Sequence, residues 1–393
     1  MQPTKQQSIT TGKFTKVNHN MAGIYIHIPF CRKACHYCNF HFSTSVKQKA
    51  AMVSAICTEA ALQQSYIQEP VDTIYFGGGT PSLLSPAELE QILQQVFKQF
   101  TVNTDAEITL EANPDDISTE KLTYWKNAGI NRLSIGIQSF FAEDLQWMNR
   151  AHTADQAKAC IQLAQQAGFN NITIDLIYGT PTLTDEKWQQ NVATAVSLNI
   201  PHISCYALTV EPKTALDKMI TLHKMENVNS ETQSRQFTQL MQWADDAGFE
   251  HYEISNFAKP GFRSRHNSSY WQGKHYLGLG PSAHSFNGIS RQWNIANNAL
   301  YLKSIEGNVL PVEVETLTNT QQLNEYIMIR LRTMEGLSLN EIAARWDINA
   351  VHKLRAGAEK YLKNDMMVLN NNSLILTRNG RLFADGIAAD LFC

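Results

Sequence analysis

Short apolar runs alternate along much of the chain with longer segments whose apolar residues recur at about every 3.6 positions. The short runs predict six strands, at Gly23–Ile28, Asp72–Phe76, Ala106–Ala112, Arg132–Ile137, Asn171–Gly179 and His202–Leu208. The segments between them, such as 46–66, 86–100 and 185–198, predict helices. Repeated strand–helix units predict an α/β fold with a parallel sheet. Six units are fewer than the eight of a closed barrel, which favours an open, partial (βα)6 barrel.

Polar residues and glycines recur where these predicted strands end. They are Cys31 after the first strand, 77–80 after the second, Glu111 near the end of the third, Gln138 after the fourth and Asp175 within the fifth. In parallel α/β sheets, ligands bind at the carboxyl ends of the strands. We therefore expect these residues to line one site.

The pattern changes at about residue 317. An amphipathic helix comes first, and the segment "LSLNEIAARW" with a second helix to about Lys363 predicts a helix-turn-helix. The last stretch predicts a hairpin wing and a closing helix. Residues 317–393 are thus expected to form a winged-helix-like α+β domain, joined by a connecting segment, 251–316, to a barrel at 21–250.

The first twenty residues are rich in Gln, Thr, Lys and Asn and show no apolar periodicity, so residues 1–20 predict a disordered tail. The segment lacks the apolar stretch of a signal peptide. Because Met21 directly precedes the first predicted strand, we suspect that it is the translation start; mass spectrometry of the native amino terminus tests this.

The overall composition narrows the possible functions. The chain has 393 residues, 43% hydrophobic content and a net charge of −3, which gives no support for binding nucleic acid through overall charge. No apolar run approaches the roughly 18 residues of a membrane span. Seven cysteines, an odd number without an export signal, favour metal or cluster binding in the cytoplasm over disulfides.

Three cysteines carry the clearest chemistry. Cys31, Cys35 and Cys38 form a CxxxCxxC pattern directly after the first predicted strand. A zinc site is one interpretation, with His27, His36 or His41 as the fourth ligand that such a site needs. An iron–sulfur cluster is the other, since thiolates hold such clusters. Three thiolates would leave one of four irons open.

The CxxxCxxC pattern, with "GGGTPS" after the second strand, resembles the radical S-adenosylmethionine (SAM) superfamily. The segments "IHIPFC", "LEANP", "SIGIQSF", "NRAH" and "IDLIYGTP" extend the resemblance to the oxygen-independent coproporphyrinogen III oxidase family, over nearly the whole chain from residue 23. The resemblance implies a [4Fe-4S] cluster on the three cysteines, whose open iron chelates the amino and carboxyl groups of SAM.

The same resemblance implies a set of residues around SAM. Its members are Tyr25, Tyr37, Gly78, Gly79, Thr80, Glu111, Gln138, Arg150 and Asp175. Each has a plainer alternative. The glycines could form an ordinary turn, Glu111 could be a surface residue, Asp175 and Arg150 could form a structural ion pair, and the tyrosines could be core residues.

Two positions distinguish the subgroups of this family. The oxidases carry a further cysteine two residues after the triad, where this chain has Phe40. In addition, "RHNSSYW", 265–271, matches the HNxxYW motif of the heme-chaperone, or HemW-type, subgroup. His266 would then be an imidazole ligand for heme iron, although a packed histidine is the ordinary reading of such a motif. The nearby "YLGLGPSAHSF" also matches the subgroup without an assigned ligand, and His284 is a weaker axial candidate.

The resulting hypothesis is a heme chaperone that carries SAM on its cluster and passes heme to apo-proteins such as respiratory cytochromes. The alternative is an oxidase that decarboxylates coproporphyrinogen III to protoporphyrinogen IX. DNA binding by the winged helix is a third possibility, but from residue 317 onward nine Lys and Arg face eight Asp and Glu, too small an excess for a DNA-docking face. We therefore expect no nucleic-acid partner.

Overall fold

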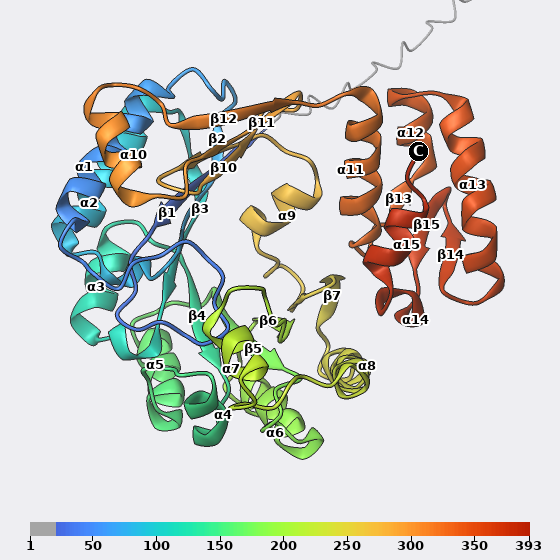
Figure 1. Cartoon of the computed structure of the whole chain (residues 1–393), viewed down its shortest axis with the longest axis horizontal. Helices are drawn as coiled ribbons and strands as arrows, with labels where there is room; N and C mark the ends of the chain where they lie inside the picture. Colours follow the sequence, from blue (N-terminus) through green and yellow to red (C-terminus); the bar gives the residue numbers. More distant parts are fainter. Residues whose placement is uncertain (1–20) are drawn as a thin grey trace, which may run out of the picture.

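A computed structural model describes residues 21–393. The expected tail, 1–20, therefore lies outside the described residues, as does any test of the start at Met21. The six predicted strands are confirmed as β1 (Ala22–Ile28), β2 (Val71–Gly78), β3 (Val102–Ala112), β4 (Arg132–Gln138), β5 (Ile172–Tyr178) and β6 (His202–Ala207). They pair in parallel and in chain order, as Figure 1 shows at the left and bottom.

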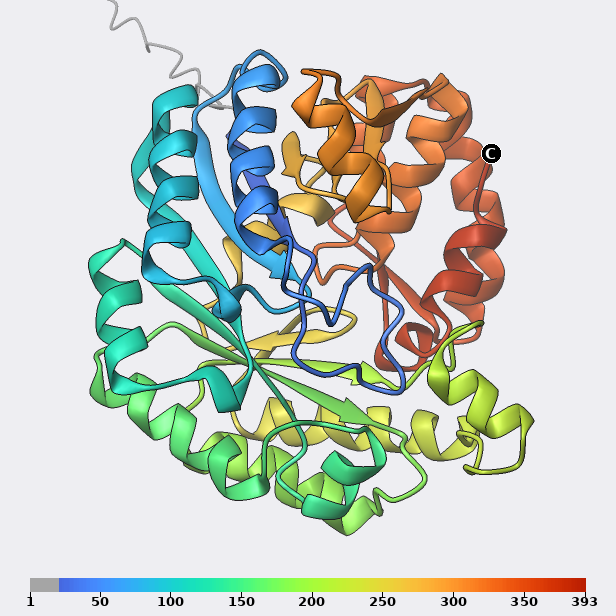
Figure 2. The same ribbon diagram turned by 60° about the vertical axis from the view of Figure 1, so that its left-hand side comes forward.

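Helices connect these strands and cover the outer face of the sheet (Figure 2). They are α1 (Lys49–Leu62), α2 (Pro86–Gln99), α3 (Thr119–Asn127), α4 (Ala142–Trp147), α5 (Ala154–Gln166) and α6 (Asp185–Ser197), followed by α7 (Ala215–Thr221) and α8 (Ser230–Asp246). The start of α2 follows from its sequence, because Ser85 and Glu88 form a reciprocal capping box and Pro86 occupies the first helical position. The expected open α/β barrel is confirmed.

The sheet is larger than the sequence predicts. Beyond β6 it continues with β8 (Asn256–Ala258) and β7 (Glu250–Glu253). On the other side, β1 pairs in parallel with β9 (Tyr276–Leu279), which is followed by β10 (His284–Phe286), β11 (Ser290–Asn294) and β12 (Val312–Thr316). The expected connecting segment therefore contributes strands to both ends of a 12-stranded sheet. The division at residues 250 and 316 stays a prediction.

A buried carboxylate fixes the segment that contains β9–β12, here called the extension, to the barrel. Glu59 of α1 accepts hydrogen bonds from the amide of Gly280 at 2.7 Å, from Asn294 Nδ2 at 2.6 Å and from the hydroxyl of Tyr301 at 2.6 Å. Tyr301 belongs to α10 (Asn298–Glu306). Because a buried polar group without partners costs free energy, this set of three donors strongly favours one position of the extension on α1.

The carboxy-terminal part has the predicted winged-helix-like order. It contains α11 (Asn319–Leu331), β13 (Leu337–Ser338), α12 (Leu339–Arg345), α13 (Ile348–Lys363), the hairpin β14 (Met367–Asn370) and β15 (Ser373–Leu376), and the closing helices α14 (Arg378–Arg381) and α15 (Ala384–Asp390). These elements enclose a hydrophobic core of their own and form the right-hand lobe in Figure 1. Between residues 21 and 393, no helix is long and apolar enough to cross a bilayer.

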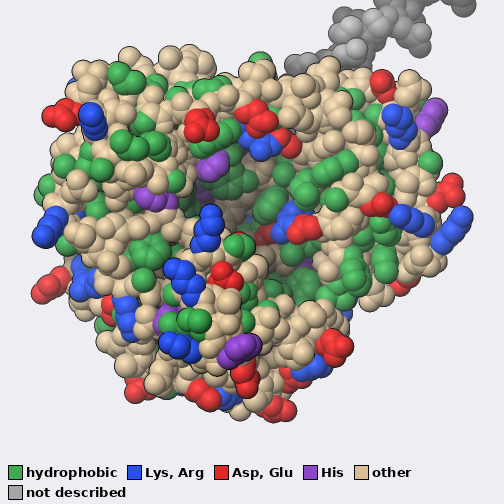
Figure 3. All heavy atoms as spheres, viewed as in Figure 1, with side chains coloured by type: hydrophobic (Ala, Val, Ile, Leu, Met, Phe, Trp, Pro, Cys, Tyr) green, Lys and Arg blue, Asp and Glu red, His purple; other side chains and the backbone are tan. Residues whose placement is uncertain are grey.

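One short helix lies between the two lobes. This is α9 (Arg265–Trp271), which contains the HNSSYW segment and contacts β1, β2 and α11. The face seen in Figure 3 is hollowed near its centre, in the area that α9 occupies in Figure 1. The segment is therefore placed against the inner side of the sheet and not on an outer surface.

Candidate functional site

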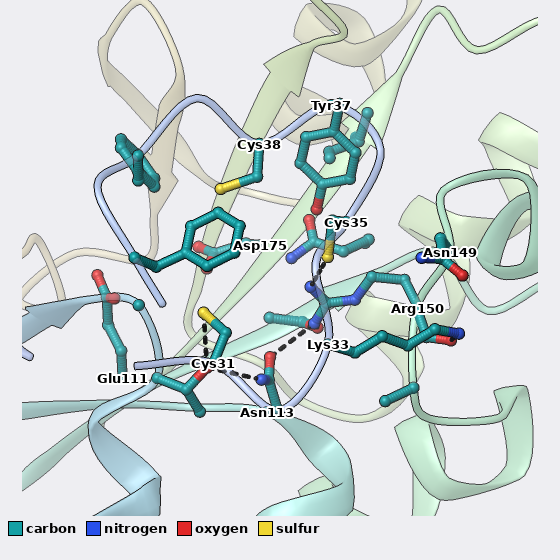
Figure 4. A pocket seen from close by; sticks show the side chains of 18 of the residues that line it. Cys31, Lys33, Cys35, Tyr37, Cys38, Glu111, Asn113, Asn149, Arg150 and Asp175 are labelled. Carbon is teal, nitrogen blue, oxygen red and sulfur yellow. Dashed lines mark hydrogen bonds between the residues drawn. The ribbon is translucent and has the colours of Figure 1, made fainter. Parts of the chain in front are cut away.

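A cavity of about 460 Å³ opens at the carboxyl ends of the parallel strands. Its wall comes from the loop after β1, from the ends of β2 to β6 and from the segment around Arg150 (Figure 4). All three triad cysteines line it, together with Tyr37, Gly78, Gly79, Thr80, Glu111, Gln138, Arg150 and Asp175. The expectation that polar residues at the strand ends meet at one place therefore agrees with the geometry. Their roles remain predictions.

The cysteine loop is held against the barrel by side chains outside it. Arg32 pairs with the buried Asp116 at 2.7 Å. Asn149 Nδ2 donates to the carbonyl of Ala34 at 2.8 Å, and His36 Nδ1 lies 3.0 Å from the carbonyl of Trp147. These contacts fix a loop that has little regular secondary structure of its own. The three thiols consequently have defined positions around one space.

Two of the thiols have polar neighbours. Arg150 Nη1 lies 3.2 Å from Cys35 Sγ, and the hydroxyl of Thr80 donates to Cys31 Sγ at 3.4 Å. Burial raises the pKa of the Cys31 thiol to about 11, and burial also raises that of Cys38. Thiolates at Cys31 and Cys38 are therefore costly unless positive charge compensates them.

This donor set fits a cluster better than a single metal ion. Among residues 21–393, no three Cys, His, Asp or Glu side chains converge as ligands of one ion would. A cluster does not require such convergence, because each thiolate binds a different iron. Iron would also supply positive charge beside these half-buried sulfurs. The residues present thus fit a [4Fe-4S] cluster.

Two carboxyl groups lie deeper in the cavity. Glu111 Oε1 accepts a hydrogen bond from the hydroxyl of Tyr75 at 2.7 Å, and burial raises the pKa of Glu111 to about 8. Burial also raises the pKa of Asp175 to about 6. Glu111 is therefore not the surface residue of the plainer alternative. Such perturbed carboxyl groups in a cleft are typical of ligand sites, where a bound hydroxyl can become their partner.

The chain bends sharply at two places along the wall. Gln138, at the end of β4, has a φ of 66°, which an ordinary side chain rarely adopts, and is nearly buried. Gly78 has a φ of 104°, and a Cβ on Gly79 would lie 2.6 Å from the carbonyl oxygen of Phe30. The glycines therefore have a packing reason as well: they let the end of β2 pass close to the loop that follows β1.

Arg150 does not form the ion pair with Asp175 that the sequence left open. Its guanidinium donates to Asn113 Oδ1 at 2.7 Å and to the carbonyl of Gly136 at 2.8 Å, besides its contact with Cys35. Sequence reasoning missed Asn113, which also donates to Thr80 at 3.2 Å. The available signal was its place two residues after Glu111 in "LEANP". Through these contacts, Arg150 and Asn113 link the cysteine loop to the ends of β2, β3 and β4.

Phe40 lies at the mouth of this cavity. Its ring is 66% exposed although it lines the site, and Tyr206, a second residue that sequence reasoning missed, is also exposed there. An aromatic ring left in water next to the cysteines occupies the position where the oxidases of the resembling family carry their additional cysteine. The triad therefore has no fourth thiol at this position in the chain.

Comparisons with known proteins agree with this geometry. The radical SAM superfamily matches residues 25–195, and the HemN C-terminal domain matches residues 317–383. The heme chaperone HemW of Mycobacterium tuberculosis is 33% identical over 375 residues, which cover 94% of each chain. That of Bacillus subtilis is also 33% identical, over 93% of this chain and 98% of its own. This chain belongs to the heme chaperone HemW family.

A solved structure supports the same fold. Coproporphyrinogen III oxidase (HemN) from Escherichia coli, described as a radical SAM enzyme, superimposes with a TM-score of 0.83 over 95% of this chain and 90% of its own. The two sequences are 22% identical, so this likeness establishes the fold alone. The radical SAM architecture implies the [4Fe-4S] cluster and SAM as cofactors of the family.

His266, the predicted heme ligand, lies outside the cysteine cavity. Its side chain is buried, with Nδ1 2.8 Å from the hydroxyl of Thr73 and Nε2 2.8 Å from that of Tyr270. The ring stacks on Tyr75 with 4.9 Å between centroids. Heme ligation by His266 stays a prediction, and it would require the imidazole to give up one of these hydrogen bonds.

Tyr25 and Tyr37 differ in position. Tyr37 lines the cavity, whereas Tyr25 stacks on Tyr75 at 6.1 Å and lies within 3.2 Å of His27 Nδ1. Tyr25 thus belongs to the aromatic group that surrounds His266, at 6.4 Å between ring centroids. Of the two tyrosines, Tyr37 has the geometry for a direct contact with a ligand of the cavity.

Proposed function

We propose that this protein is a heme chaperone, which binds heme and transfers it to acceptor proteins. One observation carries the proposal: proteins named heme chaperone HemW from distant bacteria match this chain over nearly its whole length. The match includes the barrel, the extension β9–β12 and the winged-helix-like lobe. A protein that shared only the radical SAM barrel would match a smaller part of the chain.

The cysteine cavity gives this chaperone a second ligand. Cys31, Cys35 and Cys38 would hold a [4Fe-4S] cluster, whose open iron supplies a chelation site for the amino and carboxyl groups of SAM. Glu111 and Asp175 would accept hydrogen bonds from a bound nucleoside, with Gln138 on the same cavity wall. Arg150 keeps Cys35 in position and contributes a positive charge next to a half-buried thiol.

The alternative function is oxidative decarboxylation of coproporphyrinogen III. The observation that favours it is the shared fold with the Escherichia coli oxidase. Phe40 argues against it, since this chain has an exposed aromatic ring where the oxidases have a further cysteine. We therefore treat the oxidase activity as the outcome that would contradict the proposal.

The acceptors and the compartment are part of the proposal. Heme carried by such a protein would be delivered to apo-proteins, among which we propose respiratory cytochromes. The described residues contain no disulfide, and all seven cysteines are free thiols. Free thiols intended for iron are compatible with a reducing compartment, so we propose that the protein acts in the cytoplasm.

Two assays on one preparation test this function. The cluster is reconstituted anaerobically, the protein is loaded with hemin, and a purified heme-free b-type cytochrome is added. Heme should move to the cytochrome, seen as its Soret absorption after the two proteins are separated by size. The same preparation with SAM, reductant and coproporphyrinogen III should form no protoporphyrinogen IX. Sustained decarboxylation without heme transfer would show that the protein is an oxidase.

A further inference from the structure

Tyr75 lies between the cysteine cavity and α9, and the two parts of its side chain have different partners. The hydroxyl donates to Glu111 Oε1 at 2.7 Å, and Glu111 lines the cavity on the side away from Arg150 (Figure 4). The ring stacks on His266 of α9, with 4.9 Å between centroids and 23° between planes. One side chain of β2 thus contacts both a carboxyl group of the cavity and the helix that contains the HNSSYW segment.

The ring of Tyr75 is buried and closely packed. Tyr25 stacks on it with 6.1 Å between centroids and 25° between planes. A Cβ on Gly77 would lie 3.0 Å from Tyr75 Cε1 and 3.1 Å from Glu111 Oε1. Because both distances are shorter than ordinary van der Waals contacts, a larger residue at this position would press on the tyrosine and on the glutamate. Glycine at this position therefore leaves room for the hydrogen bond between Tyr75 and Glu111.

The helix α9 is fixed to the same two strands that carry this pair. His266 Nδ1 lies 2.8 Å from the hydroxyl of Thr73, which precedes Tyr75 by two residues on β2. The amide of His266 donates at 3.1 Å to Glu107, which precedes Glu111 by four residues on β3. Side chains two or four residues apart on a strand point to the same face of the sheet. Contacts with both strands therefore hold α9 against the ring of Tyr75.

The hydrogen bond from Tyr75 has two effects on Glu111. The carboxyl group lies at the end of a flexible side chain, so fixing Oε1 before a ligand arrives reduces the entropic cost of binding that ligand. Burial raises the pKa of Glu111 to about 8, and the hydrogen bond opposes this by favouring the charged form. A carboxyl group held in this way offers a defined acceptor to a hydroxyl or amino group in the cavity.

We propose that Tyr75 is a positioning residue for SAM binding: its hydroxyl orients Glu111 in the cysteine cavity, and α9 holds its ring in place. The proposal rests on SAM as the ligand of that cavity, which is part of the function proposed above. It also gives the HNSSYW segment a role towards SAM. None of residues 265–271 lines the cavity, so the segment acts on it through Tyr75.

Calorimetric titration of the anaerobically reconstituted full chain with SAM tests the role of the hydroxyl. Tyr75→Phe should weaken SAM binding about fivefold, because Glu111 loses the hydrogen bond that orients it. Tyr301→Phe is the matched control, since it also removes a buried tyrosine hydroxyl from a glutamate, Glu59, at 2.6 Å. Tyr301 does not line the cavity, so this variant should bind SAM like the wild type.

Crystal structures of the SAM-free proteins provide a second measurement. The side chain of Glu111 should have one orientation in the wild type and more than one in Tyr75→Phe. A single, unchanged orientation of Glu111 in both proteins would overturn the proposal, because the hydroxyl would then not position the carboxyl group.

A double variant tests the support from α9. His266→Ala removes the ring that stacks on Tyr75 and should weaken SAM binding by roughly threefold. Added to Tyr75→Phe, it should cause no further loss, because the ring then carries no hydroxyl for Glu111. Losses that multiply in the double variant would overturn this part of the proposal. If His266→Ala does not fold, Thr73→Val replaces it, since that change removes the hydroxyl bonded to His266.

The remaining outcomes separate the role of Tyr75 from the proposed function. If the wild type with a full cluster does not bind SAM, the ligand of the cavity is wrong, and the role of Tyr75 falls with it. If the wild type binds SAM and Tyr75→Phe binds it equally tightly, only the role of Tyr75 is wrong. Heme transfer to the cytochrome, measured with the same wild-type protein, tests the chaperone function independently of both results.

Discussion

The Nε2 atom of His266 lies 2.8 Å from the hydroxyl of Tyr270, so two residues of the HNSSYW segment bond to one another inside one short helix. The other ring nitrogen bonds to Thr73 of β2, which is 193 residues away in the chain. The motif therefore fastens α9 to the barrel. Tyr270→Phe should lower the free energy of unfolding by about 1 kcal/mol, because His266 then loses one buried partner. Denaturant titration measures this, and an unchanged midpoint would contradict it.

His266 also predicts a pH dependence. Burial lowers its pKa to about 3, whereas an unfolded histidine titrates near 6.5. The unfolded chain then binds more protons than the folded one between these values, so stability falls as the pH is lowered from 6.5 towards 3. The wild type should lose up to about 2 kcal/mol relative to His266→Gln between pH 7.5 and pH 5. If the free energy of unfolding changes equally with pH in the two proteins, His266 does not contribute to this pH dependence.

Glu59 predicts the opposite trend. Burial raises its pKa to about 7, above the value near 4.3 of an unfolded glutamate. The folded chain then binds the extra proton, so this contribution to stability is present at low pH and is lost as the pH rises to 7. Glu59→Gln should therefore cost more at pH 5 than at pH 8, by up to about 3 kcal/mol. The exposed Glu313→Gln serves as control and should show no such difference.

The three cysteines of the triad predict how much iron and sulfide their variants bind. Cys31→Ala, Cys35→Ala and Cys38→Ala should each remove most iron and acid-labile sulfide after anaerobic reconstitution, because each thiolate binds a separate iron. Cys160→Ala, which changes a buried thiol of α5, should retain the wild-type content. Retention of a full cluster in any of the three triad variants would mean that another residue supplies the ligand.

Phe40 allows a test of the neighbouring subgroup. Because its ring is 66% exposed, Phe40→Cys should change the free energy of unfolding by no more than about 0.5 kcal/mol. The iron content should stay that of the wild type, and no coproporphyrinogen III should be decarboxylated. Gain of decarboxylation by this single substitution would show that the two subgroups differ at little more than this position.

The barrel could be predicted because its strands are short, largely buried segments in which β-branched or other aliphatic residues recur at every second position, such as "GIYIHI" and "ITIDLI". The cysteines could be predicted because their ligand spacing is local. The strands of the extension could not, since β10 has three residues and β12 alternates Val with Glu like an exposed segment. They become strands through pairing with neighbours, a non-local effect that no window along the chain contains.

The packing of His266 could not be predicted from the sequence for a similar reason. Its partners Thr73 and Tyr75 come from β2, and nothing in "RHNSSYW" indicates that this helix lies against that strand. A histidine next to two aromatic residues is compatible with a ligand and with a packed core residue. The same holds for Asn113, whose importance depends on Arg150, a residue that reaches it from another strand–helix unit.

The position of β1 in the sheet has one more consequence. This strand is hydrogen-bonded to β2 on one side and to β9 on the other, and its backbone is almost wholly buried. Its amides should therefore be among the slowest in the chain to exchange with deuterium, since their exchange needs a large part of the sheet to open. The cysteine loop begins three residues after the end of this strand. Opening of the loop therefore does not require the strand that anchors it to open.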